Sequence, residues 1–134
     1  MKRKKQNKRS IKYGGKTMND SGKREEFKSG ATREPATGKG RYDLISPEGL
    51  RRIAIWYEKG SEKYAPRNWE KGLPWSRCFS SMIRHAFAWM AGQTDEDHLA
   101  AVAWNAIALM HFEKFYSEGD DTGRPMYNIK RVFL

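Results

Sequence analysis

The sequence predicts an all-α fold, a small helical bundle of about three core helices that follows a basic N-terminal arm. All five tryptophans lie between residues 56 and 104, and apolar residues recur there at helical spacing. Up to the last helix, no segment alternates polar and apolar residues as a half-buried strand would. A chain of 134 residues is one domain, or one domain with a tail.

The arm covers residues 1–24 and is expected to be disordered, ahead of a helical domain over residues 25–134. Residues 1–41 hold 14 Lys and Arg against 4 Asp and Glu, whereas residues 42–134 hold 12 of each. The arm has too few branched apolar residues to offset its ordering entropy. Its charge suggests a weak, salt-sensitive contact with nucleic acid, or only a solubilising or leftover segment. Both interpretations stay open.

Cysteine usage and hydropathy favour a cytoplasmic protein, or the host cytoplasm if the chain is phage-encoded. Cys78 is the only cysteine, which excludes a disulfide framework and a cysteine-rich zinc site. No apolar stretch has the length of a signal peptide core or of a membrane span.

The first helix is expected over residues 46–64. Ser46 fits the N-cap, Pro47 the first helical position and Glu48 the first turn. Gly60 weakens the helix, which continues to about Tyr64. Its apolar face consists of Leu50, Ile53, Ala54 and Tyr57.

A polar loop over residues 65–75, with two prolines and a glycine, separates this helix from the next. The second helix is expected over residues 76–92, where Gly92 closes it. Its apolar stripe consists of Phe79, Met82, Ile83, Ala86, Phe87 and Met90.

The third helix is expected over residues 95–113. Thr94 fits the N-cap, and Asp97 lies where a capping-box acid would lie. After His98 the helix is apolar nearly all round and rich in alanine, which predicts a central helix packed on several sides. Past Gly119 the chain reads as a turn-rich tail with a short apolar end, a possible docking strand.

Two glutamates of the first helix are candidate metal ligands. Glu58 and Glu62 are four residues apart, so they project from the same side of the helix and repel each other. A divalent cation such as Mg²⁺ removes this repulsion, because it binds a few carboxylate oxygens together with water and phosphate. The alternative is a solvated helix flank on which both glutamates pair with neighbouring lysines.

The third helix carries polar side chains that need partners. Asp97 adjoins a polar stripe of His98 and Asn105, which lie seven residues apart on one face. A buried amide without a partner costs about 1–3 kcal/mol, so Asn105 must bind a ligand, a water or another protein group. The alternative is a structural network between helices. His111 lies off this stripe and is interpreted as a packed or surface histidine.

Cationic side chains cluster near the candidate acids, as a polyphosphate site requires: Lys63 and Arg67 directly follow the two glutamates, and the second helix carries Arg84 beside His85. Tryptophans 69, 75 and 89 could stack on a base, although most tryptophans in a small helical domain are core residues. Residues 38–44, GKGRYDL, form a basic segment with two glycines that matches no phosphate-binding loop motif. The candidate phosphate-binding cations are Lys63, Arg67 and Arg84.

Several ordered segments resemble a known family, the phage-encoded dATP/dGTP diphosphohydrolase N-terminal domain (MazZ-like proteins). They are GKGRYDLISPEGLRRIA, YEKGSEKYAPRNWEKGLPWSR, IRHAFAWMAG and DEDHLAAVAWNAIALMHFE, within about residues 25–117. The resemblance implies that a purine dNTP is cut between its α and β phosphates, with Mg²⁺, to a dNMP and pyrophosphate. The chain is more distantly similar to all-α MazG-type NTP pyrophosphohydrolases, which use E-x-x-E and E-x-x-D pairs. In this chain Glu58 and Glu62 are one residue further apart than the two glutamates of E-x-x-E. Asp97, together with His98 and Asn105, occupies the place of the E-x-x-D pair.

The combined prediction is a Mg²⁺-dependent dGTP/dATP pyrophosphohydrolase of phage nucleotide metabolism, expected as a homo-oligomer because the helical unit is small. Glu58, Glu62 and Asp97 are the predicted catalytic and metal-binding acids. The alternative is a nucleic-acid-binding accessory protein that acts through its arm, although the neutral helical domain offers no extended basic face. The predicted substrate-binding residues are Lys39, Arg41, Asp43, Lys63, Arg67, Asn68, Arg84, His85, His98 and Asn105. The first three of these are expected to close over the nucleotide from the end of the arm.

Overall fold

The computed structural model describes residues 9–13 and 15–116. The chain divides into two compact units, Met1–Leu44 and Ile45–Leu134. The tail expected after Gly119 lies outside the described residues.

The described residues of the N-terminal unit form short strands and one 3-10 helix. Strand β1 (Arg9–Tyr13) pairs antiparallel with β2 (Lys16–Asp20), and β3 (Glu25–Glu26) pairs antiparallel with β4 (Thr32–Arg33). The 3-10 helix η1 (Tyr42–Leu44) follows.

The β1–β2 hairpin lies within the segment that was expected to be disordered. Gly15, at a φ of 76°, stands in its turn, and the Gly-Gly pair between two strand-like runs is a hairpin signal. A two-stranded hairpin alone is only marginally stable in water, so it contributes little to folding.

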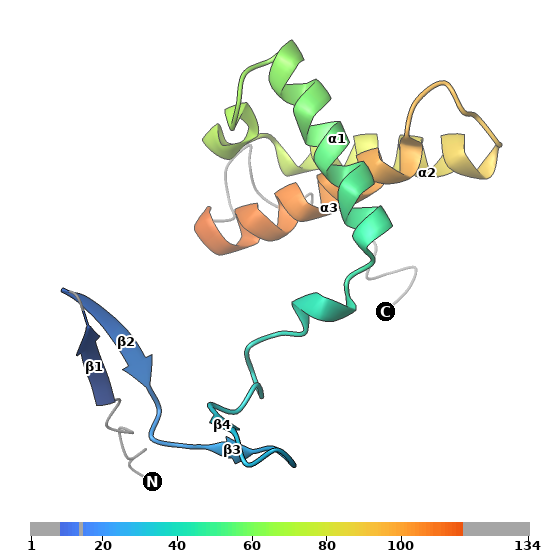
Figure 1. Cartoon of the computed structure of the whole chain (residues 1–134). Helices are drawn as coiled ribbons and strands as arrows, with labels where there is room; N and C mark the ends of the chain where they lie inside the picture. Colours follow the sequence, from blue (N-terminus) through green and yellow to red (C-terminus); the bar gives the residue numbers. More distant parts are fainter. Residues whose placement is uncertain (1–8, 14, 117–134) are drawn as a thin grey trace, which may run out of the picture. The chain divides into compact units, whose positions relative to one another are not determined.

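The helical unit confirms the predicted fold class. It contains α1 (Pro47–Lys63), the 3-10 helix η2 (Asn68–Lys71), α2 (Trp75–Met90) and α3 (His98–Phe115), and its described residues form no strand. Helices α2 and α3 run roughly antiparallel, and α1 crosses them (Figure 1). Helix α3 contacts both α1 and α2, as expected for a central helix.

Local sequence signals set most helix ends. The Ser46 hydroxyl accepts a hydrogen bond from the Gly49 N–H at 3.1 Å, which confirms the predicted N-cap of α1. Gly92, at a φ of 77°, ends α2 as predicted, and its N–H donates to the Trp89 carbonyl. The predicted N-cap of α3 at Thr94 is wrong: Asp97 caps the helix and accepts from the Ala100 N–H at 3.1 Å. Aspartate is the better N-cap of the two because its short carboxylate reaches the free N–H groups.

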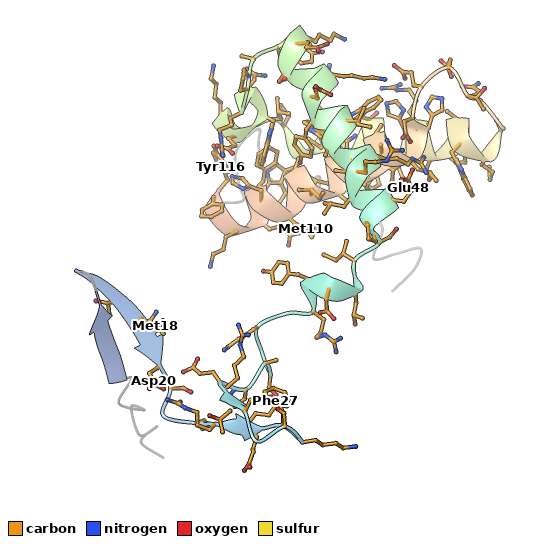
Figure 2. The ribbon with its side chains drawn as sticks, viewed as in Figure 1. Met18, Asp20, Phe27, Glu48, Met110 and Tyr116 are labelled. Carbon is orange, nitrogen blue, oxygen red and sulfur yellow. The ribbon has the colours of Figure 1, made fainter. Side chains whose placement is uncertain are left out.

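The buried core lies between α2 and α3. It consists of Trp75 and Cys78 from α2 with Ala108 and Phe112 from α3. At one end, the Tyr116 hydroxyl donates to the Glu70 carbonyl, which ties η2 to the end of α3 (Figure 2). The packing is dominated by aromatic rings, so α3 is held mainly by apolar contact.

The predicted apolar stripe of α2 is not its buried face. Ile83, Phe87 and Met90 are exposed, whereas the buried residues of α2 are Trp75, Cys78 and His85. The apolar residues of α2 extend further round the helix than α3 can cover. The fold therefore leaves an apolar surface on α2 without cover inside this unit.

Among the described residues, no helix combines the length and the apolar character needed to cross a membrane.

Replacing Phe112 by alanine should destabilise the helical unit by about 3–5 kcal/mol, because the ring is fully buried and leaves a cavity. Phe115→Ala, three residues on and 66% exposed, is the matched control and should change the unfolding free energy far less. Urea unfolding of both variants measures the difference. Equal losses would contradict the core assigned here.

Candidate functional site at the start of helix α3

An open cavity of about 440 Å³ lies where α1 meets the start of α3. Arg52 and Lys59 of α1 line it, together with Trp89 near the end of α2 and residues 93–99 of the loop and the first turn of α3. Cations of one helix therefore share a cavity with the acidic start of another.

A bidentate ion pair joins α1 to α3 at this cavity. Arg52 Nε donates to Asp97 Oδ2 at 2.8 Å, and Arg52 Nη2 donates to Asp97 Oδ1 at 2.6 Å. The hydrogen bonds from Arg52 hold the pKa of Asp97 below its usual range, and the Ala100 N–H adds to the effect. Both Asp97 oxygens are thus already used for structure, and Asp97 can bind a metal only if it gives up a partner.

Two buried histidines meet beside this ion pair. His85 of α2 and His98 of α3 are 6% and 5% exposed, and their Nδ1 atoms lie 2.9 Å apart. On its other side, His98 Nε2 lies 2.8 Å from Asp95 Oδ1. An ionised carboxylate only accepts hydrogen bonds, so His98 Nε2 carries a hydrogen.

The two Nδ1 atoms therefore share a single hydrogen, because two N–H groups or two lone pairs at that distance would repel each other. Burial lowers the pKa of His85, and the nearby charge of Arg84 lowers it further. His85 is accordingly a neutral imidazole at pH 7, which is the form that can donate a lone pair to a metal.

These histidines and a neighbouring acid can hold a metal ion. One ligand atom each from His85, Glu96 and His98 lies within 4.8 Å of the other two. The imidazoles are buried, whereas Glu96 is exposed. The start of α3 therefore offers a mixed set of nitrogen and oxygen donors.

The structure does not bring Glu58 and Glu62 to this cavity. Both are exposed on α1, and neither is among the residues that line the cavity. Glu58 immediately precedes Lys59, so it points about 100° away round the helix. Of the three predicted metal-binding acids, only Asp97 lies in the cavity.

The predicted polar stripe on α3 is divided between two roles. His98 lines the cavity, whereas Asn105 is buried deeper in the unit. Asn105 Nδ2 donates to the Ala101 carbonyl at 2.8 Å and lies 3.4 Å from Ser81 Oγ. Asn105 thus belongs to the structural network that the sequence left open as an alternative. His111 packs as expected, with its ring centroid 4.8 Å from that of Trp69.

The remaining predicted residues of the helical unit lie outside the cavity lining. Lys63 projects from the same side of α1 as Lys59, four residues earlier, and its Nζ lies 5.2 Å from the Tyr64 ring centroid. Arg67 pairs with Glu70 at 2.6 Å, where η2 begins with Asn68.

Arg84 lines a second cavity of about 530 Å³ together with apolar residues of α2, Phe79, Ile83 and Phe87. Three of the five residues that line this second cavity are apolar. The lining of this second cavity contains no acid or other metal-binding side chain beside Arg84. Phosphate binding by Arg84 stays a prediction.

Three predicted residues belong to the N-terminal unit. Arg41 Nη2 and Asp43 Oδ2 form an ion pair at 2.6 Å, and Lys39 Nζ lies 3.3 Å from Glu34 Oε2. That these residues close over a nucleotide stays a prediction.

The predicted site residues did not include four charged residues that line the cavity, Arg52, Lys59, Asp95 and Glu96. Arg52 and Lys59 are seven residues apart and so share a side of α1. This spacing was the available signal. It points to the acid-rich start of α3 only once the packing of the two helices is known.

Comparison with known proteins identifies the family of this chain. The family model described as dATP/dGTP diphosphohydrolase, N-terminal, matches residues 29–122, a range that contains all three helices and the whole cavity lining. No curated protein and no solved structure matches the chain. The family match spans well over half of the sequence, and the chain therefore belongs to the dATP/dGTP diphosphohydrolase N-terminal family.

Proposed function

We propose that this protein is a divalent-metal-dependent pyrophosphohydrolase that converts a purine deoxynucleoside triphosphate, dATP or dGTP, to its monophosphate and pyrophosphate. The single observation that carries the proposal is the cavity in which Arg52 and Lys59 face the acidic start of α3, in a chain of a diphosphohydrolase family. Cations to neutralise phosphate beside acids to hold a metal are the parts that this chemistry needs.

The cations of α1 suit a polyphosphate. Lys59 lies near enough to Asp97 for its charge to lower the pKa of that carboxyl group. Arg52 presents its guanidinium to the cavity, where Asp97 holds it in place. Lys63 extends the same side of the helix by one further turn. Because Arg52 is paired with Asp97 and Lys63 lies outside the cavity lining, Lys59 is the cation best placed to contact phosphate.

The acids that can take a metal here are Asp95 and Glu96. Mg²⁺, the ion implied by the family resemblance, is usually bound by one or two carboxylates with water and phosphate completing its shell. Glu96 is exposed, and Asp95 uses only Oδ1 for His98. When bound, such an ion polarises the phosphate and neutralises its charge.

The reaction needs a water molecule and a base. The oxygen of water bonds to the α phosphorus, and the bond from that phosphorus to the bridging oxygen breaks. Pyrophosphate leaves with the electron pair, and the proton of the attacking water passes to a base. Whichever of Asp95 and Glu96 does not hold the metal would be the carboxylate that accepts it.

Trp89 is the aromatic side chain best placed for the purine. It lines the cavity and is 56% exposed, whereas Trp75 is buried in the core and Trp69 packs among Tyr57, Trp104 and Phe112. A stacked base would cover the exposed face of the Trp89 ring.

Incubation with each dNTP and Mg²⁺ should release pyrophosphate from dATP or dGTP, and Lys59→Ala should lower kcat/KM about tenfold or more through loss of a charge-assisted contact with phosphate. Lys114→Ala, near the other end of α3, is the matched control and should keep the rate. Absence of pyrophosphate with every dNTP would refute the proposed activity.

The two candidate acid groups can be separated by substitution. Glu96→Gln should lower turnover at least tenfold because it removes a metal-binding carboxylate, whereas Glu58→Gln with Glu62→Gln should leave turnover near that of the wild type. The same pyrophosphate assay measures all three changes. If Glu58→Gln with Glu62→Gln lowered turnover and Glu96→Gln did not, the metal would be bound on α1, as the sequence alone predicted.

We also propose that the protein assembles as a homo-oligomer through the uncovered face of α2. Phe87 is 61% exposed and Met90 is 69% exposed, and exposed apolar patches of this kind mark association surfaces. Phe87→Glu should therefore lower the mass in solution, measured by light scattering. Met110→Glu on α3, a residue of similar exposure, is the control. A wild-type monomer would contradict this assignment.

A further inference from the structure

We propose that His85, His98 and Glu96 bind a divalent transition-metal ion, with both histidines using Nδ1, so that the metal centre of this cavity prefers ions such as Co²⁺, Ni²⁺ or Zn²⁺ to Mg²⁺. The role of this ion in catalysis rests on the proposed function, but its binding does not.

The distance between the two imidazoles fits a shared ion. Metal–imidazole bonds are about 2.0–2.1 Å long, so two nitrogens on one ion lie about 3.0 Å apart at a right angle and about 3.4 Å apart at the tetrahedral angle. The His85 and His98 Nδ1 atoms are 2.9 Å apart. Their approach joins α2 to α3, since the two residues lie on different helices.

The surroundings of His98 prepare its Nδ1 as a donor. Asp95 Oδ1 accepts the hydrogen of His98 Nε2, which fixes the tautomer of His98 and leaves the lone pair on its Nδ1. That lone pair accepts from His85 in the absence of metal, and it would bind the ion once His85 carries its hydrogen on Nε2 instead of Nδ1. A carboxylate behind a metal-binding histidine is a common arrangement that orients the ring and makes it more basic. Asp95 thus acts as a positioning residue for the metal.

Packing holds His85 in place. Its ring contacts the Trp56 ring at a right angle, with centroids 5.9 Å apart, so α1 supports a residue of α2. The Glu96 carboxylate is exposed and can turn towards the imidazoles, since its ligand atom already lies within 4.8 Å of theirs. Glu96 and His98 both line the cavity, so the bound ion would face the space proposed for the triphosphate.

The donor set determines which ion is preferred. Imidazole nitrogens favour Zn²⁺, Ni²⁺ and similar ions, whereas Mg²⁺ favours oxygen donors and retains several waters. Three protein ligands leave further positions for water or phosphate, as in catalytic rather than structural sites. The opposing interpretation is a hydrogen bond between two neutral histidines that serves packing alone.

The test is a titration of the full-length, tag-free and chelator-treated protein with Co²⁺, read by visible absorption, and with Zn²⁺, Ni²⁺ and Mg²⁺, read by calorimetry. We expect one equivalent of Co²⁺ to bind about 100-fold or more tightly than Mg²⁺, with a nitrogen-ligated absorption spectrum. His85→Asn and His98→Asn should each abolish that spectrum, and Asp95→Asn should weaken binding about 10–100-fold.

His111→Asn is the matched control, because the chain has three histidines and His111 packs against Trp69 instead. It should keep the spectrum and the affinity. Circular dichroism shows which variants remain folded, and for any that do not, His85→Gln and His98→Gln replace them. Absent or equally weak Co²⁺ binding, or a spectrum that survives both histidine substitutions, would overturn the inference.

Metal binding and hydrolysis can fail separately. Tight Co²⁺ binding without pyrophosphate release from any dNTP would support the metal site and refute the proposed function. Release with Mg²⁺ from a protein that shows no Co²⁺ spectrum would refute the metal site alone.

Discussion

The ion pair between Arg52 and Asp97 is the interaction on which the cavity depends. It fixes α1 against the start of α3 and, in the same carboxylate, caps the first turn of α3. The cap sets where the helix begins, and so where Asp95, Glu96 and His98 stand relative to α1. An N-cap contributes only about 1 kcal/mol. Its larger effect is positional, because cations and acids from different helices come to share one space.

The polar side chains of the apolar helix α3 each have a specific partner. His98 meets His85 and Asp95, and Asn105 donates to the Ala101 carbonyl. A buried polar group is tolerated only when its hydrogen bonds are made. Asn105 satisfies this requirement within the protein, whereas the His85–His98 pair can satisfy it with a shared hydrogen or with a metal. Because a metal could replace the shared hydrogen, the two histidines could bind a ligand, whereas the hydrogen bonds of Asn105 are already made within the protein.

Local signals predicted the fold well, whereas only two of the predicted site residues, Asp97 and His98, line the cavity, and both outcomes have one physical reason. Ser46 and Gly92 act on backbone groups within a few residues, so their effects follow from the sequence alone. Whether Glu58 faces the cavity depends on how α1 is rotated about its own axis relative to α3. The sequence pattern does not specify this rotation. The same applies to α2, whose exposed Phe87 was expected on a buried stripe. Spacing identifies residues that share a side of one helix, but tertiary packing decides what that side faces.

The charges of the cavity suit the nucleotide proposed as its ligand. Asp97 compensates Arg52, but Lys59 on one side and Glu96 on the other line the same open space. A triphosphate with its metal would complement both, because the phosphates meet the lysine while the cation meets the acid. A nucleic-acid backbone would satisfy only the cations and would be repelled by Asp95 and Glu96. The acidic start of α3 therefore favours a metal-bound nucleotide over a polynucleotide as the occupant of this cavity.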